Sequence, residues 1–199
     1  MKSKWILPLI LLVFVFFFGG GYLWMRYKLK EYKEDGELTT TLSPTILNKF
    51  QGNSISDYPF EEGSTHWEKE VLVLEDFPHE NYSIRYIGFW NKELETSENI
   101  KKDNLKGLVL LKSEDFMLSS ETVKEILESD KISSQDTAYR RFTSIQYFDL
   151  EKDRTVHRDT VWGKLPDKEA IQDGLGYGKY PRNKDVLKTL KTQLGIDEN

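Results

Sequence analysis

The chain contains no cysteine and only three histidines among its 199 residues. Without cysteine it has no disulfide, no thiolate ligand for zinc and no thiol nucleophile. The histidines never stand at the His-x-x-x-His spacing that places two imidazoles on one face of a helix. The sequence therefore predicts no cofactor, and it limits any metal or catalytic site to oxygen ligands and single histidines.

A concentrated basic surface is also missing. The chain has 28 Lys and Arg and 33 Asp and Glu; five of the basic residues and none of the acidic ones fall in the first thirty positions, so residues 31–199 carry a formal net charge of −10. The Arg140-Arg141 pair lies in a predicted strand, where neighbouring side chains point to opposite faces. Because an acidic domain is repelled by phosphate groups, we exclude nucleic acid as a partner.

One long apolar run is present, at the amino terminus. Residues 5–25 carry no charge, and a helix of this length covers about 30 Å, the hydrocarbon thickness of a bilayer. Aromatic residues stand near both ends, as in the interfacial belts of a membrane anchor: Trp5, Tyr22, Trp24 and Tyr27. The alternative is a signal peptide cleaved after Gly21. The apolar residues that continue beyond the glycines favour an anchor.

This anchor divides the chain into predicted parts. Residues 1–4 form a short cytoplasmic tail, 5–25 a transmembrane anchor, 26–42 a charged and Thr-rich stalk, and 43–199 an extracytoplasmic domain. Basic residues are nearly balanced on the two sides of the run, so the orientation rests on the very short tail, which is typical of a signal anchor. We expect a single-pass protein of the cytoplasmic (inner) membrane, whose partners are the membrane and other membrane or envelope proteins.

The domain shows strand and helix patterns in groups. Alternating or continuous apolar patterns predict strands over 68–77, 81–90, 105–113, 138–150 and 154–163. Capping residues and apolar stripes predict helices over 43–52, 119–129 and 183–195. Because strict βαβ alternation is absent, we predict the α+β class: one N-terminal transmembrane helix, then a single domain with a mainly antiparallel sheet of about five strands and two to four short helices.

The strongest catalytic candidate is the pair His157 and Asp159. The two residues lie two positions apart in a predicted strand, so their side chains share one face and can orient each other as a general base pair. Two polar residues at this spacing equally fit the solvated face of a strand.

A second candidate is a metal site in the segment EEGSTHWE. Glu61, Glu62 and His66 offer two carboxylates and an imidazole within six positions, a set that suits a divalent ion. Carboxylates beside a lone histidine are also common on a solvated surface.

Aromatic residues suggest two binding sites. Tyr82, Tyr86 and Trp90 would share one face of the predicted strand 81–90, where rings can stack on a sugar or peptide or simply pack in the core. Tyr177 and Tyr180 lie in GLGYGKYPRNKD, which lacks the P-loop pattern. We interpret that segment as a connector between helices that also offers a contact surface.

Two classes of function remain. The first, which we expect, is a single-pass membrane-anchored, non-catalytic accessory or binding domain, a subunit of a membrane or envelope assembly. The alternative is a small membrane-anchored hydrolase or metal-dependent enzyme acting on envelope material. An enzyme should bring at least two of the polar groups together in one cleft, whereas an accessory domain should leave them scattered and show an apolar patch or an edge strand.

Overall fold

The computed structural model describes residues 21–30, 58–67, 70–76, 84–86, 88–96, 105–129, 137–174 and 176–196. The chain divides into two compact units, Met1–Thr40 and Thr41–Asn199. Each unit is described by itself.

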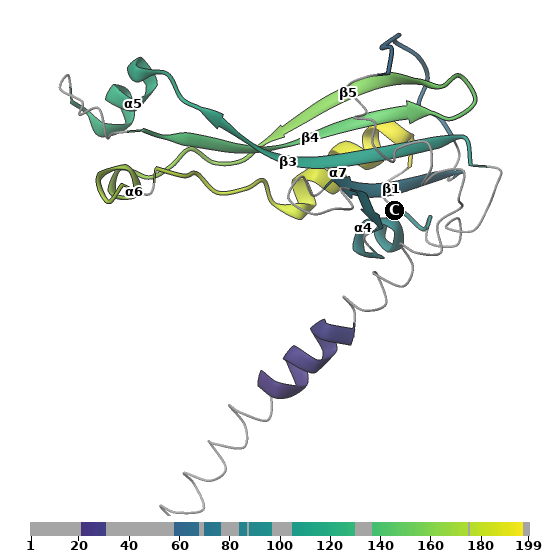
Figure 1. Cartoon of the computed structure of the whole chain (residues 1–199), viewed down its shortest axis with the longest axis horizontal. Helices are drawn as coiled ribbons and strands as arrows, with labels where there is room; N and C mark the ends of the chain where they lie inside the picture. Colours follow the sequence, from purple (N-terminus) through teal and green to yellow (C-terminus); the bar gives the residue numbers. More distant parts are fainter. Residues whose placement is uncertain are drawn as a thin grey trace, which may run out of the picture. The chain divides into compact units, whose positions relative to one another are not determined.

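In the first unit the described residues form one helix over 21–30 (Figure 1). Tyr22, Trp24 and Tyr27 are exposed on it. The helix is short and carries charged residues in its second half, and no helix in the described part of the chain is long and apolar enough to cross a membrane. This finding contradicts the predicted fold with an N-terminal transmembrane helix. Trp5, the tail and most of the apolar run lie outside the described residues.

The second unit is built on a mixed sheet with the strand order β2-β1-β3-β4-β5 (Figure 1). Four strands have six residues or more, and the fifth, β2, is a three-residue strand at one edge. The strands are β1 Val71–Asp76, β2 Ile84–Tyr86, β3 Gly107–Met117, β4 Tyr139–Asp149 and β5 Arg154–Trp162.

The centre of this sheet differs from the prediction. β1 runs parallel to β3, whereas the other neighbouring strands pair antiparallel. Parallel neighbours need a long crossover, and the chain supplies it between Asp76 and Gly107, where β2 and the helix α4 (Gly88–Glu93) lie. The prediction of a mainly antiparallel sheet missed this pairing because strand direction depends on the path of the connection and not on local pattern.

Three further helices belong to this unit: α5 Ser120–Leu127, α6 Lys168–Gln172 and α7 Asn183–Leu194. α5 begins as predicted, with the Ser119 hydroxyl accepting from the Thr122 amide at 3.3 Å. α7 ends at Gly195, whose φ of 68° lets the Ile196 amide reach the Lys191 carbonyl at 2.9 Å. Arg182 occupies the N-cap position of α7, directly before the predicted first residue of the helix, and its side chain makes no capping hydrogen bond.

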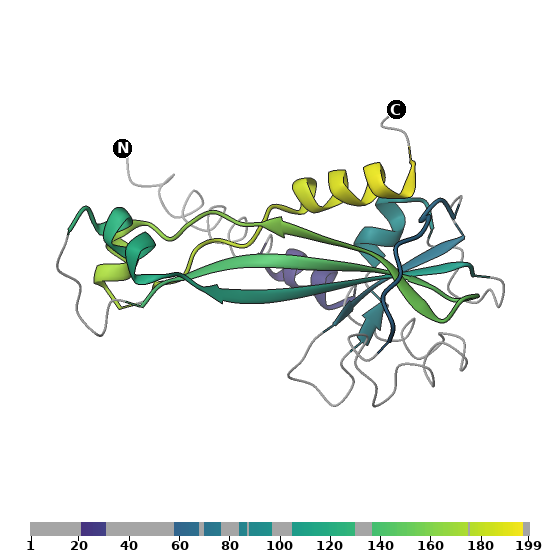
Figure 2. The ribbon, with the colours of Figure 1, turned by 90° about the horizontal axis from the view of Figure 1, so that it is seen from above.

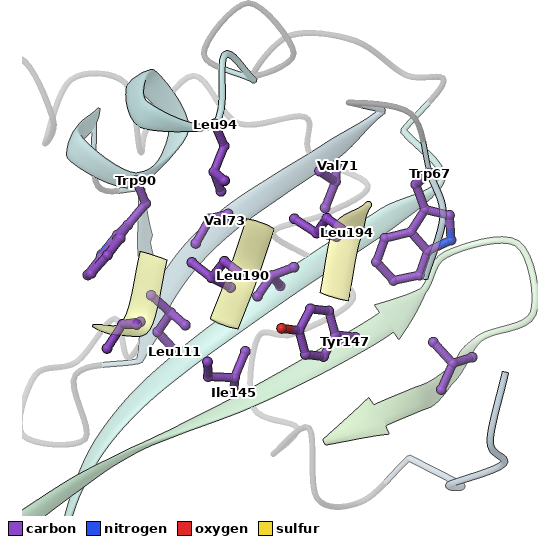
Figure 3. Close-up of a cluster of buried hydrophobic side chains, with 13 residues drawn as sticks. Trp67, Val71, Val73, Trp90, Leu94, Leu111, Ile145, Tyr147, Leu190 and Leu194 are labelled. Carbon is purple, nitrogen blue, oxygen red and sulfur yellow. The ribbon is translucent and has the colours of Figure 1, made fainter. Parts of the chain in front are cut away.

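The main hydrophobic core lies between α7, the region of α4 and one face of the sheet (Figure 3). Its buried members are Trp67, Val71, Val73, Trp90, Leu94, Val109, Leu111, Ile145, Tyr147, Val156, Val186, Leu190 and Leu194. Leu190 is 0% exposed, and complete burial of one such side chain contributes about 1.5–3 kcal/mol to the free energy of unfolding. α7 therefore depends on its apolar stripe for its position.

β3 and β4 extend well beyond this core. Both strands are 11 residues long, and residues 107–111 of β3 are buried whereas 112–117 are half-buried or exposed. Figures 1 and 2 show α5 and α6 together at the end of the strands that lies away from α7. There they enclose a second buried cluster, Val123, Leu127, Ala138 and Ile171. We call residues 112–129, 137–144, 160–174 and 176–180 the arm.

Candidate functional site

One face of the arm carries a continuous group of aromatic and cationic side chains. We call it the aromatic surface; its members are Phe116, Arg140, Phe142 and Trp162. They come from β3, β4 and β5, where Phe116 is paired with Arg140 and Phe142 with Trp162. Residues that lie opposite each other, and residues two apart on one strand, share a face of the sheet. The register therefore places all four side chains on the same side.

Trp162 is at the centre of this surface. Its ring centroid lies 4.8 Å from that of Phe142 and 5.7 Å from that of Phe116, the latter in an edge-to-face arrangement. Arg140 Cζ lies 5.0 Å from the Trp162 ring, a cation–π contact, and its Nε donates to the Gly163 carbonyl at 2.9 Å. Trp162 remains 42% exposed and Phe116 52% exposed. These rings are held in place yet face solvent.

The opposite face of the arm has an aromatic group of its own. Tyr139 stacks on Tyr177 with ring centroids 4.9 Å apart. Arg141 Cζ lies 4.8 Å from the Tyr177 ring and 4.5 Å from the Tyr180 ring, and its Nε lies 3.3 Å from an Asp115 carboxylate oxygen. The structure therefore brings the predicted residues Tyr177 and Tyr180 together around the guanidinium group of Arg141. Each tyrosine side chain is about half exposed.

Close backbone contacts explain Gly163 and Gly178. A Cβ atom on Gly163 would lie 1.9 Å from the Lys179 carbonyl oxygen, and one on Gly178 would lie 2.2 Å from the Lys164 carbonyl oxygen. The outgoing chain after β5 and the returning chain before α7 thus meet backbone to backbone. Gly163 and Gly178 permit this contact, and the hydrogen bond from the Gly178 amide to the Tyr139 carbonyl (2.8 Å) places Tyr177 beside β4.

The structure brings the proposed catalytic pair into contact. His157 Nε2 lies 3.3 Å from an Asp159 carboxylate oxygen, and both side chains are partly exposed on β5. The Tyr147 ring lies beside His157, with centroids 5.4 Å apart. Burial raises the pKa of Tyr147 above its ordinary value, and the negative charge of Asp159 raises it further. Tyr147 therefore stays a neutral phenol next to the His157–Asp159 pair.

The proposed metal ligands do not come together. Glu61 pairs with Arg154, Glu62 is exposed, and the His66 ring lies near Gly195 at the end of α7. Among the residues that the structure describes, no group of three or more His, Asp or Glu side chains is placed to hold a metal ion.

The predicted aromatic strand is interrupted. β2 ends at Tyr86, and α4 begins at Gly88, so Trp90 belongs to a helix and cannot share a strand face with Tyr86. Trp90 is 6% exposed and donates its indole N–H to Glu75 Oε1 at 2.5 Å. Tyr82 lies outside the described residues. Trp90 is therefore a core residue with a satisfied polar atom.

Sequence reasoning missed the aromatic surface. Phe116 and Trp162 contact each other across β4, although they are far apart in the sequence. The available signal was Arg140 and Phe142, a cationic and an aromatic residue two positions apart in a predicted strand. Only the register of the three strands shows that these side chains meet.

Comparison with known proteins gives no match: no family model, no curated protein and no solved structure matches this chain significantly.

Proposed function

We propose that this chain is a non-catalytic binding domain, an accessory subunit of a membrane or envelope protein assembly, and that it holds a protein partner through the aromatic surface. The observation that carries the proposal is the fixed, solvent-facing group around Trp162, with rings from Phe116 and Phe142 and the guanidinium of Arg140. Aromatic residues and arginine are the residue types that dominate the binding energy of protein interfaces.

The position of these side chains supports binding over packing. The strand residues of the main core are no more than 2% exposed, whereas Phe116 and Trp162 keep 52% and 42% of their surface exposed. Covering them with a partner would remove apolar area from water at about 25 cal/mol per Å². Because Arg140 is already held by the Gly163 carbonyl and the Trp162 ring, little side-chain entropy is lost on binding.

The location at the cytoplasmic membrane, with the domain on the extracytoplasmic side, is part of this proposal. Its support is the sequence, namely the uncharged apolar run at residues 5–25. Alkaline extraction of membranes tests attachment, and protease protection of intact cells tests the side on which residues 58–196 lie.

One observation favours the alternative, a hydrolase. His157 Nε2 and Asp159 are in contact beside the neutral Tyr147, as a general base and the group that orients it would be. His157→Ala separates the two functions, because it should remove any hydrolytic activity on envelope material and leave partner capture by the aromatic surface unchanged.

The test of the binding function is capture from gently solubilised membranes with the tagged full-length protein, followed by mass spectrometry. Phe116→Ala should reduce the recovery of a stoichiometric partner at least tenfold. Phe89→Ala is the matched control, since Phe89 is 39% exposed but lies in α4, away from the arm. Equal recovery by wild-type protein and Phe116→Ala would contradict the proposed role of the aromatic surface.

A further inference from the structure

β5 forms one edge of the sheet, and its outer side is only partly covered. Near its start, the Thr155 amide donates to the Pro59 carbonyl at 3.0 Å, and the Gly63 amide donates to the Val156 carbonyl at 3.0 Å. Beyond Val156, no described residue makes a backbone hydrogen bond to the outer side of β5 as far as Trp162. Within the described part of the chain, the second half of β5 is therefore an open edge.

The direction of the backbone groups on this edge follows from one hydrogen bond. The Gly163 amide donates to the Arg141 carbonyl of β4 at 2.8 Å, so the backbone of Gly163 faces β4. Backbone groups alternate in direction along an antiparallel strand. Arg158, Thr160 and Trp162 therefore direct their amide and carbonyl groups outward. Such a row is a template for a further strand.

We propose that the strand that pairs with this edge is β5 of a second copy of the same chain. The two strands run antiparallel about a two-fold axis, with Thr160 opposite Thr160 of the other copy. In this register Arg158 lies opposite Trp162 of the other copy. All three outward-facing residues then exchange backbone hydrogen bonds, and the two sheets become one.

The space on the edge selects this register. If the pair were centred on Asp159, Trp162 of the second copy would lie opposite Val156, whose carbonyl is already bound by Gly63. A centre nearer the start of β5 would overlap further with the segment around Gly63. A centre nearer the end would leave outward-facing groups unpaired. Thr160 is the centre that uses the whole open edge.

The side chains select the same register. Residues directly opposite each other across a strand pair interact, and like charges there are destabilising. A centre at Asp159 would place two carboxylates opposite each other, and a centre at Arg158 would do so with two guanidinium groups. The Thr160 register places no like charges directly opposite each other. Arg158, whose Cζ lies 5.0 Å from the Phe60 ring centroid within its own chain, lies opposite Trp162 of the other copy, a ring that is 42% exposed and already has Arg140 over it.

This dimer is tested separately from the proposed binding function, because its hydrogen bonds come from the backbone edge of β5, although it also covers Trp162 of the aromatic surface. Trp162 belongs to both surfaces, so the experiment substitutes other residues. Phe116→Ala, which should reduce partner capture, should leave the dimer unchanged, and each proposal can fail without the other.

The absence of cysteine makes a disulfide test possible. Purified full-length protein with Thr160→Cys is oxidised with copper phenanthroline and separated on a non-reducing gel. Residues paired in this way have Cα atoms about 5.5 Å apart, within the range of a disulfide, so we expect most of the chain to run as a covalent dimer. A Thr160→Cys chain that stays monomeric would overturn the proposal.

Two controls define the register. Ser113→Cys places an exposed thiol on β3, away from the edge, and measures random collision. Arg158→Cys places thiols roughly 13 Å apart in the proposed register, so its cross-linking should stay at the level of Ser113→Cys. Stronger cross-linking through Arg158→Cys than through Thr160→Cys would overturn the register.

A cysteine-free variant gives a second readout. Thr160→Pro removes an outward-facing amide without removing a hydrogen bond to β4, a position where proline is tolerated. Sedimentation of the full-length protein in detergent should show at least a tenfold weaker dimer for this variant. An unchanged monomer–dimer distribution would argue against pairing through β5.

Discussion

The side-chain amide of Asn91 binds both backbone groups of Val73. Asn91 Oδ1 accepts from the Val73 amide at 2.9 Å, and Asn91 Nδ2 donates to the Val73 carbonyl at 2.7 Å. Asn91 is 0% exposed and lies in α4, and Val73 is at the middle of β1. A helix residue thus supplies the hydrogen bonds that a neighbouring strand would make, and α4 is fixed against β1.

Replacement of Asn91 with alanine should destabilise the domain strongly. Asn91→Ala leaves the buried amide and carbonyl of Val73 without this partner, and each such group costs about 1–3 kcal/mol. We expect a loss of roughly 2–4 kcal/mol in the free energy of unfolding, measured by thermal unfolding of the full chain in mild detergent. Lys92→Ala, at an exposed position of the same helix, should change it by less than about 0.5 kcal/mol. A similar melting temperature for both variants would contradict the role of Asn91.

A second prediction concerns the backbone contact at the base of the arm. Gly163→Ala places a Cβ atom 1.9 Å from the Lys179 carbonyl oxygen and 2.9 Å from that of Arg141. The two segments must separate, at a cost of about 1–3 kcal/mol. Amide hydrogen exchange should become faster at Gly178, which donates to Tyr139, and stay unchanged in α7.

The control for this variant is Lys164→Ala, which removes an exposed side chain next to the same contact. It should leave the exchange rate of the Gly178 amide at the wild-type value. Uniformly faster exchange over the whole domain in Gly163→Ala would mean that the glycine supports global stability and not the arm.

Asp76 gives a prediction for the dependence of stability on pH. Burial raises the pKa of Asp76; the positive charge of Lys112 lowers it, and the negative charge of Glu114 raises it. Because its pKa is higher in the folded state, the folded chain binds the proton more tightly. Ionised Asp76 therefore destabilises the fold at neutral pH, and this effect disappears as the pH falls below the raised pKa.

Asp76→Asn should thus raise the melting temperature at pH 7, and the difference from wild type should shrink as the pH is lowered toward 4. Asp115→Asn is the control, since Asp115 lies on the exposed half of β3. A difference that grows on acidification would mean that ionised Asp76 stabilises the fold, against this prediction.

Local signals were enough to predict some elements. Ser119 begins α5 and Gly195 ends α7 because a hydroxyl cap and a positive φ act on residues only a few positions away. Trp90 was wrongly assigned to a strand because only the local sequence pattern was available. An aromatic residue fits a strand or a helix equally well. The hydrogen bonds between Asn91 and Val73 of β1, which form only in the folded chain, favour the helix.

The same difference between local and long-range contacts applies to the candidate site. Contacts within one short segment were predicted, such as His157 with Asp159, and the prominence of Tyr177 and Tyr180 followed from their segment alone. The group around Trp162 was not predicted, since Phe116 reaches it only through the register of three strands. The grouping of Glu61 and His66 failed because neighbours in an irregular segment can turn to different surroundings, one to Arg154 and the other to the end of α7.

The pairing of β3 with β4 continues without a shift from Gly107 and Asp149 in the core to Met117 and Tyr139 at the tip. The described strands therefore contain no hinge between the arm and the body of the domain. A pull or push on the aromatic surface is transmitted along this ladder to the strand residues that pack under α7. The arm is therefore continuous with the core. A force applied at its tip acts on the core residues Ile145 and Leu111.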